Sequence, residues 1–377
     1  MIPFADPSTG EQLAPVDDTL ESDGGGRYPI VDGIARFVET ESYAAGFGLE
    51  WTLHSETQLD SRTGRTVSRQ RLERCIGASV SSLRGLRILE VGCGAGRFTE
   101  LLVAGGALVH AIDLSRAVDV NRANIGPAPN YRVAQADLLA APFPDGSFDY
   151  VICLGVLQHT PSPEESIRAL WRKLRLGGTL VVDHYTWSLS RATKLDSLLR
   201  PIIKRLPPPA AKSITDFLVR IFFPLHWAVR NSRPTIGGVP LLQMMLSRVS
   251  PASWNYRVSP HLPKHYHYES SRLDTFDHLA DRYKRLRTRG QIRKALASLG
   301  AVEIEVWKGG NGIEARCRKP APPSSASASI VRGSSTHAGT STPGSTTAPE
   351  DARSGARVSA TERQHRRRPF ACRGCRD

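Results

Sequence analysis

Short apolar runs alternate with helical or loop patterns through the middle of the chain. Five of these runs predict buried strands: Arg87–Val91, Leu108–Ile112, Tyr131–Val133, Phe148–Cys153 and Thr179–Asp183. A repeated strand–helix–strand rhythm is typical of an α/β fold with a parallel, doubly wound sheet, in which ligands bind at the carboxyl ends of the strands. We therefore look for functional residues where these strands end.

The alternation of helix and strand patterns resumes between residues 289 and 317. Arg289–Leu299 predicts a helix that ends at Gly300, and Val302–Trp307 and Ile313–Cys317 predict two strands joined by Gly309–Gly312. These segments supply a last helix and an antiparallel strand pair for the same sheet.

A long insertion, residues 186–288, separates the two parts of this core. A parallel crossover needs only a helix and two loops, so the insertion predicts a cap or extra lobe. Within it, Ser213–Val229 is apolar and aromatic, with basic residues on both sides. This segment predicts either an amphipathic helix on an anionic membrane or, preferentially, a helix packed over a pocket mouth or in a subunit contact. Three of its residues argue against a membrane span: Asp216, Arg220 and Pro224.

The first strand leads into the glycine-rich stretch ILEVGCGAGRFT, residues 88–99. Gly92, Gly94 and Gly96 permit a tight turn and a close approach of backbone to a ligand. The N–H groups at the start of the following helix favour electron-rich groups. The stretch predicts a strand, a turn and a helix start around a small polar ligand.

Two carboxylates follow the next two strands. Asp113 ends the second strand, where a carboxylate can accept both hydroxyls of a ribose. Asp137 follows the third strand and is placed to accept a hydrogen bond from an exocyclic amine. Together with the glycine turn, these residues predict a nucleoside site.

Four motifs in this order resemble the class I S-adenosylmethionine-dependent methyltransferases: ILEVGCGAGRFT, the acid Asp113, QADLLAAPFPDGSFDYVICLGVLQHT and RKLRLGGTLVVDHY. The resemblance covers about residues 86–185 and resumes near Gly290. It implies a transferase with a Rossmann-like sheet and S-adenosyl-L-methionine as its cofactor. A dinucleotide site is the competing interpretation of the turn, but its fingerprint needs Gly or Ala where Arg97 stands.

The resemblance also implies roles for individual residues. Glu90 and the three glycines surround the methionine part of the cofactor, and Asp113 binds the ribose with Leu114 beside the adenine. Asp137 and Leu138 hold the adenine, while Leu154 and Gly155 line the floor near the sulfonium.

Catalysis by such an enzyme is mostly positioning, with a base needed only where the acceptor must lose a proton. His159 after the fourth strand, and His184 and Tyr185 after the fifth, are expected to open onto one crevice. His265 to Tyr268 predicts either part of an acceptor pocket or a polar surface loop. We predict no metal site, because His265 and His267 lack further ligands at suitable spacing.

Composition limits the partners. The net charge is +14 with a pI near 9.8, which suggests a nucleic-acid or anionic-membrane partner, but residues 320–377 contain nine Arg against four acids. We expect a small-molecule or sugar-bearing acceptor; the alternatives are an RNA methyltransferase and a cofactor-binding protein that has lost its chemistry. The sequence does not predict an oligomeric state.

The remaining predictions concern the ends of the chain and its compartment. Residues 1–40 resemble a zinc-ribbon-like module found with some methyltransferases but contain no cysteine, so we expect a metal-free docking module or an ordered arm. Residues 41–80 predict a linker and lid helix, and residues 320–377 a disordered tail. Six scattered cysteines fit a reducing, cytoplasmic compartment, and we predict neither a signal peptide nor a spanning helix.

Overall fold

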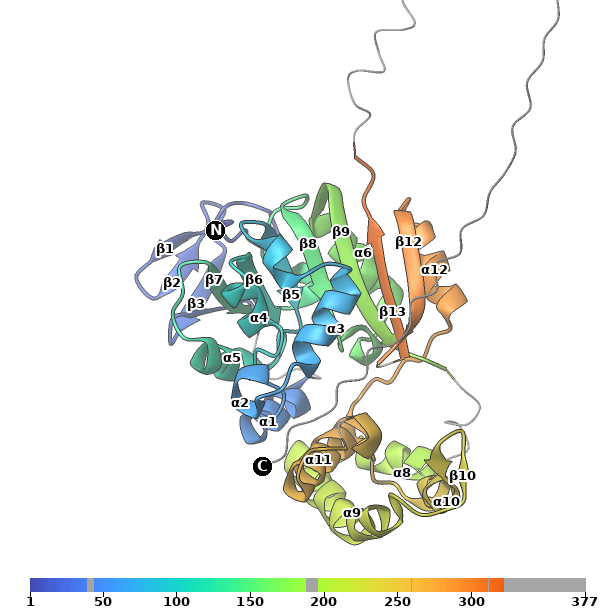
Figure 1. The fold of residues 1–377 in the computed structure, drawn as a ribbon. Coiled ribbons are helices and arrows are strands. Elements are labelled where there is room, and N and C mark those ends of the chain that lie inside the picture. Colours follow the sequence, from blue (N-terminus) through green and yellow to red (C-terminus); the bar gives the residue numbers. More distant parts are fainter. Residues whose placement is uncertain (39–43, 188–195, 259, 311, 322–377) are drawn as a thin grey trace, which may run out of the picture. The chain divides into compact units, whose positions relative to one another are not determined.

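The computed structural model describes residues 1–38, 44–187, 196–258, 260–310 and 312–321 (Figure 1). Among these residues, eleven strands form one sheet in the order β1-β2-β3-β4-β7-β6-β5-β8-β9-β13-β12. Five neighbouring parallel strands form its centre: β7 (Tyr131–Gln135), β6 (Leu108–Asp113), β5 (Arg87–Val91), β8 (Phe148–Cys153) and β9 (Leu174–Tyr185). The predicted doubly wound α/β fold is confirmed, although β9 begins five residues earlier than its apolar run suggested.

Helices pack on both faces of this sheet because its strands are apolar on both sides. Ile88 and Ile152 pack on one face with three helices, α3 (Val67–Ile76), α4 (Thr99–Ala104) and α5 (Ala117–Ile125). Leu89 and Val151 face the other side and pack with α6 (Pro163–Lys173) and α12 (Arg289–Ala297). Burial on both faces fixes the strands and hence the positions of the loops that follow them.

The last part of the core completes the sheet as expected. Helix α12 begins at a capping box in which the Thr288 hydroxyl and the Gln291 side chain each bind the other's backbone N–H. Strand β13 (Gly312–Arg318) then lies antiparallel between β9 and β12 (Val302–Gly309). The prediction of an antiparallel strand pair is therefore confirmed.

The N-terminal strands, for which we expected a docking module or an ordered arm, continue the main sheet. They are β1 (Ala14–Val16), β2 (Thr19–Glu21), β3 (Arg27–Val31) and β4 (Ile34–Arg36), and β4 pairs in parallel with β7. Ile2 and Phe4 belong to the main hydrophobic core, and the Ile2 N–H donates to His110 Nε2 at 2.8 Å. The segment extends the sheet because β7 would otherwise leave its edge N–H and C=O groups unpaired.

Helical segments follow in the region predicted as linker and lid. Helix α1 (Ala45–Leu53) contacts α5, α9 and α11, and α2 (Asp60–Thr63) leads into α3. Four short 3₁₀ turns are η1 (Val80–Leu83), η2 (Leu138–Ala140), η3 (Leu157–His159) and η4 (Tyr256–Val258).

The insertion forms a mainly helical lobe between β9 and α12. Its described elements are α8 (Asp196–Ile203), α9 (Pro208–Val229), β10 (Thr235–Ile236), β11 (Val239–Pro240), α10 (Leu241–Val249) and α11 (Lys264–Ala280). His265 to Tyr268 lie in the first turns of α11, and His267 is buried, so the surface-loop interpretation of this segment is wrong. Residues 322–377, where we predicted a disordered tail, lie outside the described residues. No helix in the described part of the chain has both the length and the apolar character needed to span a bilayer.

Candidate active site

A cavity of about 250 Å³ lies at the carboxyl ends of the central strands. Helices α1 and α11 contribute Phe47, Glu50, Trp51, Asp274 and Asp277 to its wall. Ten residues predicted from the sequence also line it: Gly92, Gly94, Asp113, Leu114, Asp137, Leu138, Leu154, Gly155, His159 and Tyr185. Predicted nucleoside-binding and catalytic residues therefore share one cavity.

The glycine turn has backbone conformations that other residues rarely adopt. Gly92, Gly94 and Gly96 have φ values of +73°, +49° and +103°. The Gly94 N–H donates to Asp113 Oδ2 at 3.0 Å, while the N–H and hydroxyl of Ser115 donate to Oδ1 at 2.8 and 2.7 Å. These bonds fix the Asp113 carboxylate in the cavity wall, where burial raises its pKa.

Glu90 and Gly96 do not reach the cavity surface, which corrects their predicted contact with a ligand. The Glu90 side chain lies under the start of α4, where the Thr99 hydroxyl donates to Glu90 Oε2 at 2.7 Å. Burial raises the pKa of Glu90 to about 8, so its carboxyl group is mostly protonated at neutral pH. Gly96 packs toward Ile125 of α5 instead. Both residues support the turn from behind.

A buried ion pair closes the cavity floor, and the sequence did not reveal it. Asp183 is 1% exposed; its Oδ1 accepts from the Gly155 N–H at 2.5 Å and its Oδ2 pairs with Arg71 Nη2. Arg71 comes from α3 and also lines the cavity. The only signal in the sequence was the charged residue Asp183 within an apolar strand, because a buried charge needs a partner. The pair holds the loop after β8 against the end of β9.

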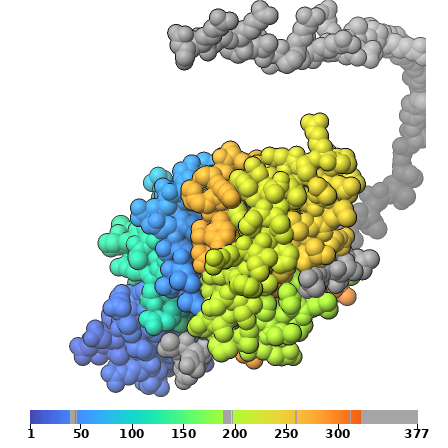
Figure 2. Space-filling model, turned by 90° about the horizontal axis from the view of Figure 1, so that it is seen from below, coloured from blue at the N-terminus to red at the C-terminus, as the bar shows by residue number. Residues whose placement is uncertain are grey.

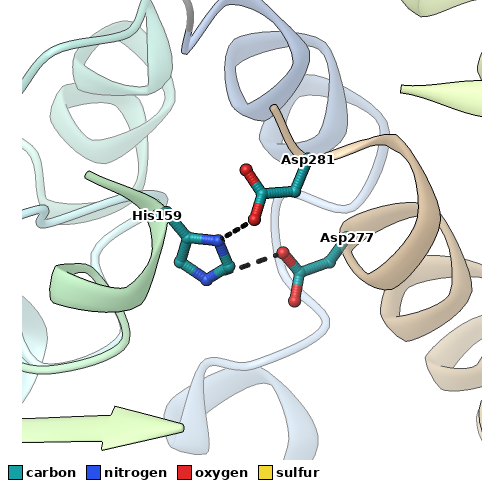
Figure 3. Close-up of side chains that lie close together, drawn as sticks. All are labelled: His159, Asp277 and Asp281. Atoms are coloured by element: carbon teal, nitrogen blue, oxygen red, sulfur yellow. Dashed lines mark hydrogen bonds and ion pairs between the residues drawn. The ribbon is translucent and has the colours of Figure 1, made fainter. Parts of the chain in front are cut away.

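His159 lines the cavity and lies close to two carboxylates, those of Asp277 and Asp281 (Figure 3). Its Nδ1 is 2.5 Å from Asp281 Oδ2, and its Nε2 is 3.8 Å from Asp277 Oδ1. Burial lowers the pKa of His159, but Asp277 and Asp281 outweigh burial, so the pKa lies above its ordinary value of 6.5. The cluster can therefore orient the ring and hold a proton.

Tyr185 extends this cluster as a hydrogen-bond donor. Its hydroxyl donates to Asp277 Oδ2 at 3.0 Å, and its ring lies 5.4 Å from that of His159. Burial, followed by the charge of Asp277, raises the pKa of Tyr185 well above 10.0. Tyr185 therefore remains a neutral donor across the physiological pH range.

His184 does not share this crevice, which corrects our prediction for it. Successive strand residues point to opposite faces, so Tyr185 faces the cavity and His184 faces away from it. His184 is fully buried, and its Nδ1 lies 3.0 Å from the Tyr185 carbonyl oxygen. Its role is in packing rather than at the cavity.

Two further acids in the wall were missed by the sequence analysis. Burial raises the pKa of Asp274 to about 6, and burial together with Asp277 and Asp274 raises the pKa of Glu50 well above 4.5. They come from α11 and α1, segments without a recognisable motif.

His159, Asp277 and Asp281 also present ligand atoms within 4.8 Å of one another, close enough to hold a divalent cation.

The comparisons with known proteins concern the middle of the chain. Residues 89–182 match the family model "Methyltransferase domain". A ubiquinone biosynthesis O-methyltransferase from Ralstonia nicotianae is 39% identical over 104 residues, which cover 26% of this chain and 43% of the relative. That from Xanthomonas euvesicatoria is 36% identical over 143 residues, covering 36% of this chain and 58% of the relative.

The chain thus spans about half the length of these curated relatives. Among solved structures, it resembles a putative S-adenosyl-L-methionine-dependent methyltransferase from Methanococcus maripaludis with a TM-score of 0.40 and 12% identity, over 76% of this chain and 99% of the other. Residues 89–182 of this chain are therefore similar to a methyltransferase domain.

Proposed function

We propose that this chain transfers a methyl group from S-adenosylmethionine to a hydroxyl oxygen of a small-molecule acceptor. One observation carries the proposal: the glycine turn and Asp113 share a cavity with a histidine that is held by a carboxylate. The matched relatives are named as O-methyltransferases, which supports oxygen as the methylated atom. Sugar hydroxyls remain within this acceptor class.

The residues present fit the methyl donor. Asp113 and Asp137 place carboxylates where they can accept from ribose hydroxyls and an adenine amine, and Leu114 and Leu138 provide apolar contacts. Gly155 has φ of +83° and open space where a Cβ would stand. No side chain at this position therefore fills the part of the cavity that the Gly155 backbone borders. When bound, the donor supplies an activated methyl group on a cationic sulfur.

The remaining chemistry belongs to His159. With Nδ1–H directed at Asp281, the neutral ring keeps its lone pair on Nε2, which accepts the proton of the acceptor hydroxyl. Asp281 and Asp277 stabilise the imidazolium that forms. Tyr185 anchors Asp277, and the aromatic residues Phe47 and Trp51 of α1 help to exclude water.

The charge of the wall favours a small acceptor over RNA. Four aspartates contribute to the cavity surface against two cations, Arg71 and Arg97, and carboxylates repel a phosphate backbone. The aspartates are Asp113, Asp137, Asp274 and Asp277. The proposal is tested by transfer of labelled methyl from the donor to compounds of a cell extract, followed by mass analysis of the product. A methyl ether on a small molecule supports the proposal; label found only in RNA, or donor binding without any product, contradicts it.

The pH dependence of the reaction follows from the raised pKa of His159. Because only the neutral ring accepts a proton, the rate should rise with pH and level off above a midpoint higher than 6.5. Asp281→Asn removes a charge that raises this pKa, so the midpoint should move to lower pH. The measurement is the rate of methyl transfer at saturating donor across pH.

The matched control for this profile is Asp196→Asn. Asp196 contacts His278 at 2.7 Å in the same lobe but does not line the cavity. Its substitution should leave the midpoint unchanged. An unaltered midpoint in Asp281→Asn would show that His159 does not control the rate.

Gly92 gives a steric test of the donor site. A Cβ at this position would lie 2.0 Å from Val156 Cγ2, so in Gly92→Ala the Val156 side chain or the loop that carries it must shift. We expect donor affinity, measured by calorimetric titration, to fall about tenfold or more, since tenfold corresponds to about 1.4 kcal/mol.

Gly146→Ala is the control, because Gly146 has a similar φ of +70° and open space around the Cβ position. It should retain the donor affinity of the natural chain. The double variant Gly92→Ala with Val156→Ala should recover affinity, and failure to recover would point to backbone strain rather than the clash.

A further inference from the structure

The outer face of α9 is apolar although it lies in water. Ile214, Phe217, Ile221 and Leu225 are 40% to 61% exposed, and their spacing places them along one side of the helix. The opposite side packs inward through buried residues: Ala211, Thr215, Val219, Phe223 and His226. Lys212 is also buried on this inward side, so the apolar residues of the outer side are the ones that the described residues leave uncovered.

Helix α10 buries a polar residue and exposes apolar ones, which is the reverse of an ordinary surface helix. It buries the polar Gln243, whose Nε2 lies 2.7 Å from His226 Nδ1 on α9. Four large apolar residues are 41% to 61% exposed instead: Leu242, Met244, Met245 and Val249. Exposed apolar clusters of this kind mark contact surfaces, because burial of such groups is favourable.

The charge around these two helices indicates what covers them. Residues 196–258 contain nine Lys and Arg but only two acids, Asp196 and Asp216. Asp216 is paired with Lys212 and Arg272, and Asp196 with His278. Exposed cations of this region are Lys204, Arg205, Arg220, Arg233, Arg248 and Arg257. A second copy of the chain would bring the same positive charge, whereas an anionic bilayer offers both apolar depth and negative charge.

We propose that the outer faces of α9 and α10 dock on the surface of a bilayer that contains anionic lipid. Figure 2 looks onto the lobe that carries them, drawn in yellow-green and yellow. The apolar side chains insert among the acyl chains near the headgroups, and the basic residues contact lipid phosphates. The helices lie on the bilayer and do not cross it. This inference concerns a surface separate from the cavity and does not rest on the proposed methyl transfer.

The test is co-sedimentation of the full-length chain with phosphatidylcholine vesicles that contain phosphatidylglycerol, and with vesicles of phosphatidylcholine alone. Binding should require the anionic lipid and weaken with salt. The double variant Phe217→Glu with Met245→Glu should bind about tenfold less tightly or worse, because charges replace inserting groups. Arg220→Glu with Arg248→Glu should weaken binding to the anionic vesicles without altering the apolar face.

Leu176→Glu is the matched control, since Leu176 is 54% exposed on β9 and outside the lobe. It should bind like the natural chain, and circular dichroism of every variant should show the native fold. Equal binding by the natural chain and the Phe217/Met245 variant would overturn the proposal, because other basic segments such as residues 363–368 would then carry it. Absence of binding would also overturn it, as would a dimer in analytical ultracentrifugation that this variant abolishes without any vesicle binding.

Discussion

Replacing His159 with alanine is expected to slow methyl transfer about 10²- to 10⁴-fold, the usual contribution of a positioned general base. We expect this loss because the His159 ring lies in the cavity, where Asp281 orients it and Asp277 stabilises its protonated form. Donor affinity should change little, because Asp113 and the glycine turn lie on other loops. Single-turnover rates and a calorimetric donor titration separate the two effects.

His278→Ala is the control for this variant. His278 is also paired with an aspartate on the same lobe, but it does not line the cavity. Its removal should leave the single-turnover rate close to that of the natural chain. A His159→Ala enzyme with a nearly unchanged rate would show that the acceptor needs no base or finds another one.

Substituting Arg71 with methionine is expected to lower the free energy of unfolding by about 3 to 5 kcal/mol, as found when one partner of a buried ion pair is removed. Asp183 would then remain buried with one hydrogen bond from the Gly155 N–H and no countercharge. The measurement is the urea midpoint and slope of the full-length chain.

The double variant Arg71→Met with Asp183→Asn should regain most of the lost stability, because the amide oxygen still accepts from Gly155 and no charge remains buried. Arg62→Met serves as the exposed comparison, since Arg62 and Glu56 are 57% and 58% exposed; it should cost less than about 1 kcal/mol. A similar small effect for Arg71 would mean that water or another group satisfies Asp183.

The central strands and the positions of the glycine turn, Asp113 and Asp137 in the cavity wall could be predicted because their signals are local. A buried parallel strand is a continuous apolar run, and the turn after β5 needs glycine at positions that the sequence displays. Asp113 and Asp137 could be placed because the ends of neighbouring parallel strands meet at one edge.

The acceptor side could not be predicted to the same extent because its partners are distant in sequence. His159 meets Asp281 across 122 residues, and Arg71 meets Asp183 across 112. His184 was misplaced because a one-residue step along a strand reverses the face. Glu90 was misplaced because the motif suggests contact, whereas the Thr99 hydroxyl holds its side chain under α4. The pairing of the N-terminal strands with β7 could not be predicted, because it depends on tertiary structure.

The most direct test of the donor site is a calorimetric titration of S-adenosylmethionine into three full-length proteins: the natural chain, Asp113→Ala and the surface control Asp145→Ala. The Asp145 side chain is 55% exposed beside Lys173. We expect one donor to bind per chain, and the binding free energy to weaken by about 1 to 3 kcal/mol in Asp113→Ala through lost hydrogen bonds to a carboxylate. Asp145→Ala should bind like the natural chain. No binding by the natural chain, or equal affinity in Asp113→Ala, would contradict the assignment of this cavity to the methyl donor.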